Sequence, residues 1–366
     1  MNLAILVAAG ALAVLAGSTP ASRPVRRGAA ALLFALMLAA PLLSSTTSIL
    51  FDALTAMAIA YGWNVIGGYA GYASFGNVAY LGLGAFVAAG LMSRQPGHAA
   101  LPWWIGIPIA VAVVAAVAAL IGLVVLRLRG HYFSIATLGV AVAMPQIINW
   151  DGPFGPGGLL PNFFGGGRPL NFPLADDLAV LGLELSADRY LFYYLALATA
   201  LVGWGVTLAL TRAKFGYGLV AIRENEEAAE VMGVNTWAAK VCAYALSAGL
   251  AGLGGAVIGY RLTNMTTEAE ALFSTANNLQ MIIICLIGGV GTLWGPWIGA
   301  CVLFALQELL RQLSGNADFL RWQAIVFSAL IVLVVLFLPD GVLRFVGSRP
   351  RLGWRVLAGR RAPGRA

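Results

Sequence analysis

Charged residues are scarce in this 366-residue chain, where Asp, Glu, Lys and Arg together make up 10% of the sequence. Soluble domains carry about 25% charged and about 45–50% apolar residues. Here 60% of the residues are hydrophobic and the mean hydropathy is +0.85. A soluble fold of this length has too little interior for so many apolar side chains. The composition therefore indicates a protein that crosses a membrane several times.

Cysteine and histidine are scarce as well. Cys242, Cys285 and Cys301 lie in separate apolar segments, so we expect them to fill the core rather than to form a disulfide framework. His98 and His131 have no cysteine or carboxylate at ligand spacing. We therefore expect no metal site.

Motifs for nucleotide hydrolysis and covalent catalysis are absent too. No Gly-x-x-x-x-Gly-Lys-Ser/Thr sequence occurs, so the chain is not expected to hydrolyse ATP itself. The stretch "GGVGTLWG" at 288–295 contains Gly-x-Gly without a preceding strand, which predicts a tight turn or break between spans. Ser74 and Ser134 have no His and Asp companions in their segments. We expect a protein that is not an enzyme and binds no cofactor of its own.

Eleven apolar runs are long enough, or nearly so, to cross a bilayer, which takes about 20 residues. They lie at 3–17, 29–50, 52–70, 73–92, 102–126, 132–150, 189–210, 241–260, 277–293, 295–311 and 322–338. Glycine-rich turns join the third run to the fourth and the ninth to the tenth. The first run is either a span, which we prefer, or a signal peptide, because "STPAS" resembles a cleavage site. We predict an all-α, polytopic membrane helix bundle of about 10–11 spans, including broken or half-membrane helices.

Lys and Arg are enriched in the cytoplasmic segments of membrane proteins. If the N-terminus lies outside the cell, most basic residues of this chain fall in segments on the cytoplasmic side. Sixteen of the 22 basic residues then lie inside, namely Arg23, Arg26, Arg27, Arg127, Arg129, Arg212, Lys214, Arg223, Lys240 and seven arginines between 344 and 365. Most acidic residues fall outside. This charge pattern predicts a cytoplasmic C-terminus.

The stretch "AIRENEEAAEVMGVN" at 221–235 places five charged residues between two apolar runs. The residues from Gly218 to Met232 favour one helix, and Gly233 suits a left-handed cap. Small residues on one face would let another protein approach closely, with charged residues at the rim. This face comprises Ala221, Ala228 and Met232 with Ala229 close by, and the rim comprises Arg223, Glu224 and Glu227. The alternative is a solvated amphipathic helix.

Polar residues inside the apolar runs cost free energy unless they are paired or face water. They are Asn64, Ser74, Asn77, Thr137, Gln146, Asn149, Asn277, Asn278 and Gln280. Each either bonds between helices or lines a polar, nearly uncharged pathway, which would suit a zwitterion with an apolar side chain. Glu308 and Arg311, at positions i and i+3, are expected to pair.

Five blocks of the sequence resemble a known family. "EAAEVMG" at 227–233 resembles the coupling-loop signature of bacterial ABC importer permeases. Together with "AYALSAGLAGLGGAV", "IGGVGTLWGPWIGA", "GGYAGYASFGNVAYLGLGAF" and "RLRGHYFSIATLGVA", it is similar to the LivM-type permease subunit of branched-chain amino acid ABC importers. The resemblance covers about residues 52–346. The Leu-Pro that ends the longer permease signature is absent, and "DGPFGPGG" matches the family's Thr-Gly-Gly-rich block only loosely.

The resemblance implies a permease of the bacterial inner membrane that moves branched-chain or other hydrophobic amino acids inward. Its implied partners are a second homologous permease subunit, two cytoplasmic ABC ATPase subunits that hold the ATP, and an extracytoplasmic substrate-binding protein. ATPase coupling would fall to Arg223, Glu224, Glu227, Ala228, Ala229 and Gly233. The pathway would be lined by Asn64, Ser74, Asn77, Thr137, Gln146, Asn277, Asn278 and Gln280.

Two other functions remain open. Urea and short-amide permeases share much of the pattern. An ion-coupled secondary carrier usually places an ionisable residue at the centre of a span, and none is clearly placed so here.

Three parts are expected along the chain: a short span and basic loop at 1–28, the transmembrane permease domain at 29–346 and a basic cytoplasmic tail at 347–366. Within the permease domain, 151–188 form an outer loop region and 211–240 the cytoplasmic coupling loop. Because so long a loop is often functional, 151–188 are either a structured cap or a docking surface or gate.

Overall fold

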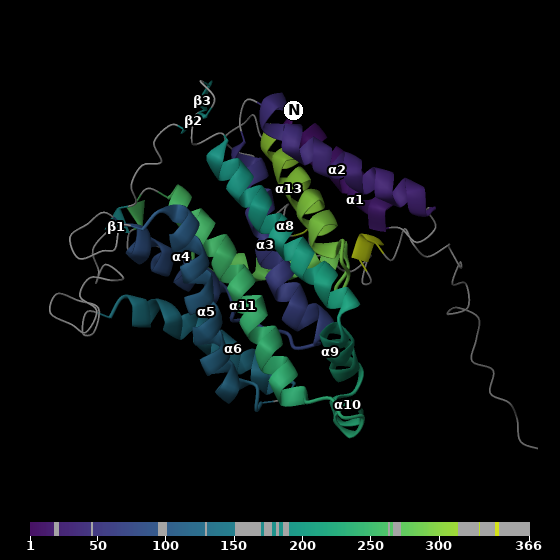
Figure 1. Cartoon of the computed structure of the whole chain (residues 1–366), viewed down its shortest axis with the longest axis vertical. Coiled ribbons are helices and arrows are strands. Elements are labelled where there is room, and N and C mark those ends of the chain that lie inside the picture. Colours follow the sequence, from purple (N-terminus) through teal and green to yellow (C-terminus); the bar gives the residue numbers. More distant parts are fainter. Residues whose placement is uncertain are drawn as a thin grey trace, which may run out of the picture.

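The apolar runs fold into helices close to where the sequence predicts them (Figure 1). The computed structural model describes residues 1–17, 22–44, 47–93, 101–128, 130–150, 170–171, 178–180, 183–185, 190–262, 264–265, 272–313, 329 and 341–343. The helices that match the predicted runs are α1 (Asn2–Gly17), α2 (Arg23–Leu43), α3 (Ser48–Trp63), α4 (Asn77–Met92), α5 (Trp103–Val125), α6 (His131–Ile148), α8 (Leu191–Arg212), α11 (Thr236–Arg261), α12 (Thr275–Gly288) and α13 (Gly295–Leu313). Apart from residue 329, the last predicted run lies outside the described residues, as does the tail at 347–366.

Six helical stretches of the described chain are long and apolar enough to cross a membrane. They are Pro24–Leu43, Ser48–Tyr69, Trp103–Val125, His131–Ile148, Leu191–Arg212 and Thr236–Arg261. The apolar helices α1, α4 and α12 are shorter. The 14 residues of α12 rise about 21 Å, which is less than the hydrocarbon thickness of about 30 Å. These lengths confirm a polytopic helical bundle, in which some apolar helices are shorter than the hydrocarbon thickness.

Small residues let the central helix α11 pack closely against α4 and α5, its most extensive neighbours. A Cβ atom on Gly259 would lie 3.0 Å from the Cβ atom of Ala85 in α4, and one on Gly252 would lie 2.8 Å from Val114 in α5. Such close backbone approach is a common basis of helix association in membranes. At the periphery, α1 packs against α2 and α13, so the first apolar run is a helix of the bundle.

Both predicted breaks lie between paired helices. The first break, residues 64–76, lies between α3 and α4, and the second break, residues 289–294, lies between α12 and α13. The helix α3 continues into a π-helix, η1 (Asn64–Tyr69), and an irregular segment at 70–76 then leads into α4. Residues 289–294 separate α12 from α13. Gly71 and Gly291 have φ angles of +77° and +70°, which glycine adopts without the steric cost that a Cβ atom would add.

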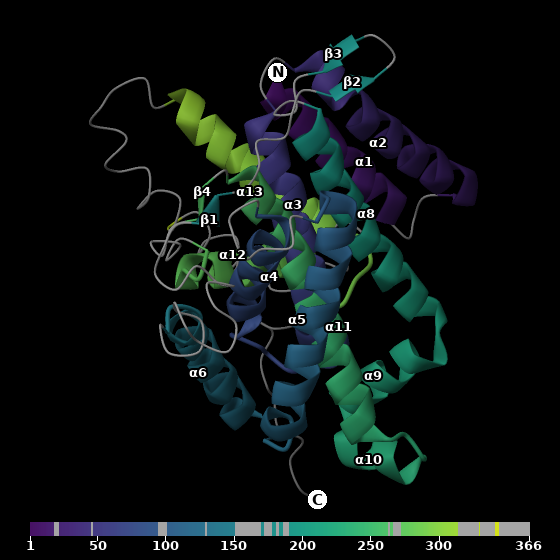
Figure 2. The ribbon, with the colours of Figure 1, turned by 60° about the vertical axis from the view of Figure 1, so that its left-hand side comes forward.

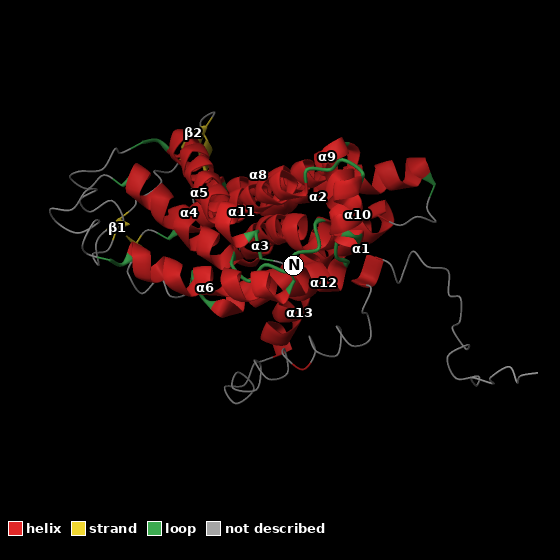
Figure 3. Cartoon of the chain, turned by 90° about the horizontal axis from the view of Figure 1, so that it is seen from below, coloured by secondary structure: helices red, strands yellow, loops and turns green. Residues whose placement is uncertain are grey.

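Four very short strands supplement the helices, which dominate the described chain (Figure 3). β1 (Leu170–Asn171) pairs antiparallel with β4 (Asn264–Met265), and β2 (Leu178–Val180) pairs with β3 (Leu183–Leu185). The first pairing joins the predicted outer region at 151–188 to the segment that follows α11. The β2–β3 hairpin lies at the end of the bundle opposite two small helices, α9 (Lys214–Glu224) and α10 (Glu226–Val231) (Figure 2). We call the end with α9 and α10 the coupling end, and the other the far end.

Candidate functional site

The charged segment between α8 and α11 forms two helices, so the prediction of one helix from Gly218 to Met232 is wrong. Asn225 adopts an extended backbone with a φ of −160°, and its side chain accepts a hydrogen bond of 3.0 Å from the Ala228 backbone N–H. Asparagine favours such a cap over the helix interior because its side chain competes for backbone groups. The acidic side chains of Glu226 and Glu227 lie in the first turn of α10, where the helix dipole favours them. The predicted continuous face is therefore divided at Asn225.

A left-handed glycine ends α10, as the sequence predicts. Gly233 has a φ of +87°, and its backbone N–H donates to the Glu230 carbonyl at 2.9 Å. Beside this cap, the side chains of Val231 and Met232 are 87% and 84% exposed. Ala228 is exposed with them, and we call these three residues the α10 tip.

Ala229 does not lie on the exposed face of small residues that the sequence predicts for contact with another protein. It is 4% exposed and belongs to the core of the chain itself. The α10 helix therefore presents Ala228 outward and Ala229 inward, although the two residues are adjacent in the sequence.

The first turn of α10 is tied to the break between α3 and α4. Lys240 in α11 forms an ion pair of 2.6 Å with Glu226, and the two side chains are 4% and 15% exposed. The Tyr72 hydroxyl donates to the second carboxylate oxygen of Glu226 at 2.5 Å, and the ammonium group of Lys240 donates to the same hydroxyl at 3.3 Å. These contacts join α10, α11 and the irregular segment at 70–76.

Arg223 makes a second connection between the coupling end and this break. Its guanidinium group donates to the Gly68 carbonyl in η1 at 2.9 Å and pairs with Glu224 at 3.0 Å. A Cβ atom on Gly291 would lie 2.9 Å from Nη1 of Arg223, so the guanidinium group also lies against the second break. The sequence predicted Arg223 and Glu224 only as rim residues facing another protein, so neither their pairing with each other nor the bond to Gly68 was expected from it.

Asn64 joins the two breaks directly. Its side-chain nitrogen donates to the Thr292 carbonyl at 3.1 Å, and its side-chain oxygen accepts from the Gly291 backbone N–H at 2.8 Å. The Tyr61 hydroxyl adds a bond of 2.9 Å to the Leu293 carbonyl. Hydrogen bonds and contacts therefore run from α10 and Arg223 through residues 64–72 to residues 289–294.

Other polar residues of the predicted pathway bond between segments near the first break. Ser74 donates to the side-chain oxygen of Asn77 at 3.0 Å, and the amide nitrogen of Asn77 donates to Ser247 in α11 at 3.0 Å. The Thr137 hydroxyl accepts from the Phe75 backbone N–H, and Asn278 donates to the Phe75 carbonyl. These side chains are buried, and their bonds hold residues 74–77 against α6, α11 and α12.

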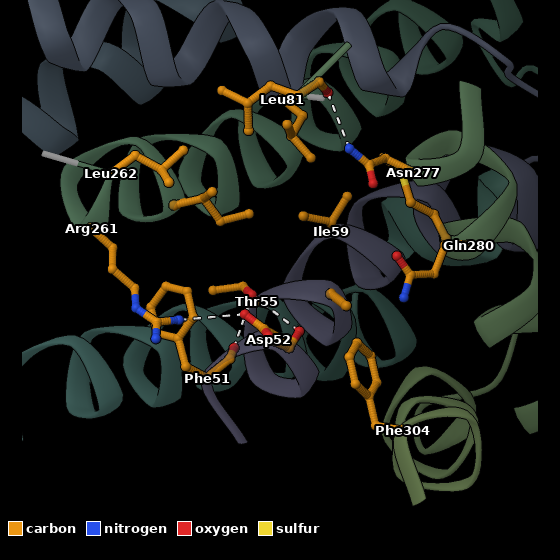
Figure 4. Close-up of a pocket in the computed structure, with 14 residues that line it drawn as sticks. Phe51, Asp52, Thr55, Ile59, Leu81, Arg261, Leu262, Asn277, Gln280 and Phe304 are labelled. Atoms are coloured by element: carbon orange, nitrogen blue, oxygen red, sulfur yellow. Dashed lines mark hydrogen bonds and ion pairs between the residues drawn. The ribbon is translucent and has the colours of Figure 1, made fainter. Parts of the chain in front are cut away.

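The remaining predicted pathway residues, which line two cavities, are Gln146, Asn277 and Gln280. A cavity of about 560 Å³ lies between α4, α6 and α12, and Gln146, Asn149 and Asn278 contribute to its wall. A cavity of about 580 Å³, which we call the outer cavity, lies at the far end between α3, α11, α12 and α13 (Figure 4). Asn277 and Gln280 contribute to its wall.

Asp52 and Arg261 also line the outer cavity, and sequence reasoning did not select them as site residues. The signal was available, because both charges lie near the predicted outer ends of apolar runs. The predicted pair of Glu308 and Arg311 forms at 2.7 Å and is confirmed. These two residues do not line the outer cavity.

Sequence comparison connects this architecture to transport proteins. The family described as "branched-chain amino acid transport system / permease component" matches residues 45–335. The chain is 30% identical over 306 residues to the high-affinity branched-chain amino acid transport system permease protein LivM of Escherichia coli, covering 80% of this chain and 68% of LivM. No solved structure matches.

Permeases for other cargoes are also similar. The galactose/methyl galactoside import permease protein MglC of Escherichia coli is 28% identical over 267 residues, which is 70% of this chain and 74% of MglC. The nucleoside ABC transporter permease protein NupC of Lactococcus lactis is 28% identical over 183 residues, covering 47% of this chain and 54% of NupC. The chain therefore belongs to the branched-chain amino acid transport system permease family and is a multi-pass inner-membrane permease of an ABC transporter.

Proposed function

We propose that this chain forms one half of the pore of an ABC importer for branched-chain or other hydrophobic amino acids. A second homologous permease forms the other half. Two ATPase subunits bind and hydrolyse ATP in the cytoplasm, and an extracytoplasmic binding protein delivers the cargo. The family match and the similarity to LivM support this cargo, while MglC and NupC make sugars and nucleosides the alternatives to test.

The observation that carries the coupling part of the proposal is the α10 tip. Val231 and Met232 are almost fully exposed on a helix that also carries Glu226, Glu227 and Glu230. A helix of six residues with three glutamates is unsuited to insert into a bilayer. The exposed side chains of Val231 and Met232 therefore need a protein surface to bury them. A cleft in the ATPase would bury the tip, and Glu227 would lie at its rim.

Movement of the tip would reach the bundle through Arg223 and Glu226. Both side chains bond to the first break, and Asn64 bonds the first break to the second. A partner switches a protein between two states only if it binds them with unequal affinity. The ATP-bound ATPase pair would supply this difference, and the two breaks are where the helices can change their relative positions.

We also propose that the coupling end and the C-terminus lie in the cytoplasm. The distribution of basic residues supports this orientation, and the β1–β4 pairing keeps 170–171 and 264–265 together near the far end. An impermeant thiol reagent added to intact cells should label Trp150→Cys and leave Met232→Cys unlabelled. The reverse labelling would overturn this orientation.

Uptake and ATPase association test the function together. The chain should be expressed with its genomic neighbours in cells that lack other uptake routes for leucine, galactose, a nucleoside and urea. We expect ATP-dependent uptake of leucine alone, and an ATPase that co-purifies with the chain. Uptake of only another cargo would reassign the substrate. Uptake driven by an ion gradient, without a co-purifying ATPase, would indicate a secondary carrier.

A further inference from the structure

The outer cavity contains two opposite charges that the coupling contacts do not use. The carboxylate of Asp52 in α3 and the guanidinium group of Arg261 in α11 lie at one side of it (Figure 4). Asn277 and Gln280 extend from α12 at the opposite side (Figure 4). Between these polar groups, the wall includes Ile59 and other apolar side chains.

The two charges are only loosely bound to each other. Nη1 of Arg261 lies 3.5 Å from the Asp52 carboxylate, and the side chains are 27% and 56% exposed. A partly exposed pair of this length contributes little to stability, so a ligand can separate the two groups at small cost. The guanidinium group also lies over the Phe51 ring at 4.3 Å and bonds to Ser48 at 3.2 Å, and these contacts hold it at the cavity wall.

The rest of the wall is suited to an apolar group. Ile59, Met281 and Phe304 come from three different helices and face the same space. The Thr55 hydroxyl donates to the Phe51 and Asp52 carbonyls, so its hydrogen bond remains within α3. A volume of about 580 Å³ lies within the range of small-molecule sites, about 300–1,000 Å³.

We propose that the outer cavity binds a zwitterionic α-amino acid on its way into the pore. Arg261 binds the carboxylate, Asp52 binds the ammonium group, and the apolar side chain lies toward Ile59, Met281 and Phe304. This inference rests on the proposed function and assigns the recognition of the cargo to particular residues. Urea and sugars have no formal charges, so they would leave both groups unmatched.

Protection of a cysteine in the cavity tests the site without relying on transport. Ala56 lines the cavity one helical turn after Asp52, and Ala56→Cys adds a thiol there. Cys242→Ser removes the exposed native thiol, whereas Cys285 and Cys301 are buried. In the purified complex without its binding protein, L-leucine should slow maleimide labelling roughly tenfold at about ten times its dissociation constant.

Two leucine analogues then separate the two charges. Leucinamide lacks the carboxylate and 4-methylpentanoate lacks the ammonium group, so each should protect more weakly than leucine. In Arg261→Gln, leucine should protect no better than leucinamide. In Asp52→Asn, leucine should protect no better than 4-methylpentanoate. If the ion pair were purely structural, each variant would not lose selectively the preference for leucine over the one analogue that lacks the corresponding charge.

Two further variants control for folding. Arg311→Gln breaks another ion pair near the far end and should keep full protection by leucine, because Arg311 does not line the cavity. Arg261→Lys keeps the charge without the planar fork and should keep partial protection. Equal protection by leucine and urea, or none by leucine in a complex that imports leucine, would overturn the site. A complex that does not import leucine would instead refute the proposed function.

Discussion

Two ion pairs at opposite ends of the bundle differ in length and burial. Lys240 and Glu226 are 2.6 Å apart, with side chains 4% and 15% exposed, whereas Arg261 and Asp52 are 3.5 Å apart and 27% and 56% exposed. Charges shielded from water hold each other firmly, while exposed charges are screened by solvent and salt. The Lys240–Glu226 pair, which we call the inner pair, is therefore suited to transmit a displacement. The Arg261–Asp52 pair, which we call the outer pair, is suited to separate when a ligand binds.

The largest effect should come from the buried pair. Lys240→Met leaves the Glu226 carboxylate partly buried without its cation, which should lower the free energy of unfolding by about 3 kcal/mol or more. Unfolding of the detergent-solubilised chain in SDS measures this change. Lys214→Met is the control, because Lys214 is an exposed lysine of α9, and it should have an effect within about 0.5 kcal/mol.

A double variant makes this prediction sharper. Glu226→Gln combined with Lys240→Met removes both charges and should recover much of the lost stability, since a buried pair is costly chiefly when one partner is missing. If Lys240→Met is as stable as the parent chain, the inner pair is no firmer than the outer one.

Adjacent alanines in α10 should respond differently to the same substitution. Ala229→Trp overfills the core, and overpacking typically costs about 1–3 kcal/mol of stability. Ala228→Trp changes an exposed residue of the α10 tip, so it should leave stability unchanged while preventing ATPase association. Unfolding and ATPase co-purification measure the two effects. Equal destabilisation by both substitutions would contradict the assignment of the two faces.

Breaking the outer pair should change stability much less than breaking the buried pair. Arg261→Gln should change the free energy of unfolding by less than about 1 kcal/mol, because the pair is long and partly exposed. The same unfolding titration measures it. A loss comparable to that of Lys240→Met would remove the contrast between the two ends.

The sequence predicts the helices well because long apolar runs in a membrane protein have few alternatives to helix. It also predicts both breaks, the positive φ of Gly233 and the pairing of Glu308 with Arg311 from local patterns alone. It does not predict the division at Asn225, where the cap of a short helix prevails over the helix propensity of the residues on both sides.

Contacts between distant segments cannot be derived from those patterns. Arg223 and Gly68 are 155 residues apart, and Asp52 and Arg261 are 209 residues apart. Only the packing of α3 against α11 places the last two together. Likewise, helical spacing grouped Ala229 with Ala228, but the packing of α10 against the bundle buries one and exposes the other.

Arg223 offers the most direct test of the central claim that the charged segment couples ATP hydrolysis to transport. The measurement is the number of leucine molecules imported per ATP hydrolysed by the complete complex in proteoliposomes. Arg223→Met removes the bond to Gly68 while leaving the α10 tip intact, and Glu224→Gln is the control that keeps that bond. We predict that Arg223→Met retains its ATPase and hydrolyses ATP but imports at least tenfold less leucine per ATP than the control. An unchanged ratio in Arg223→Met would contradict the account.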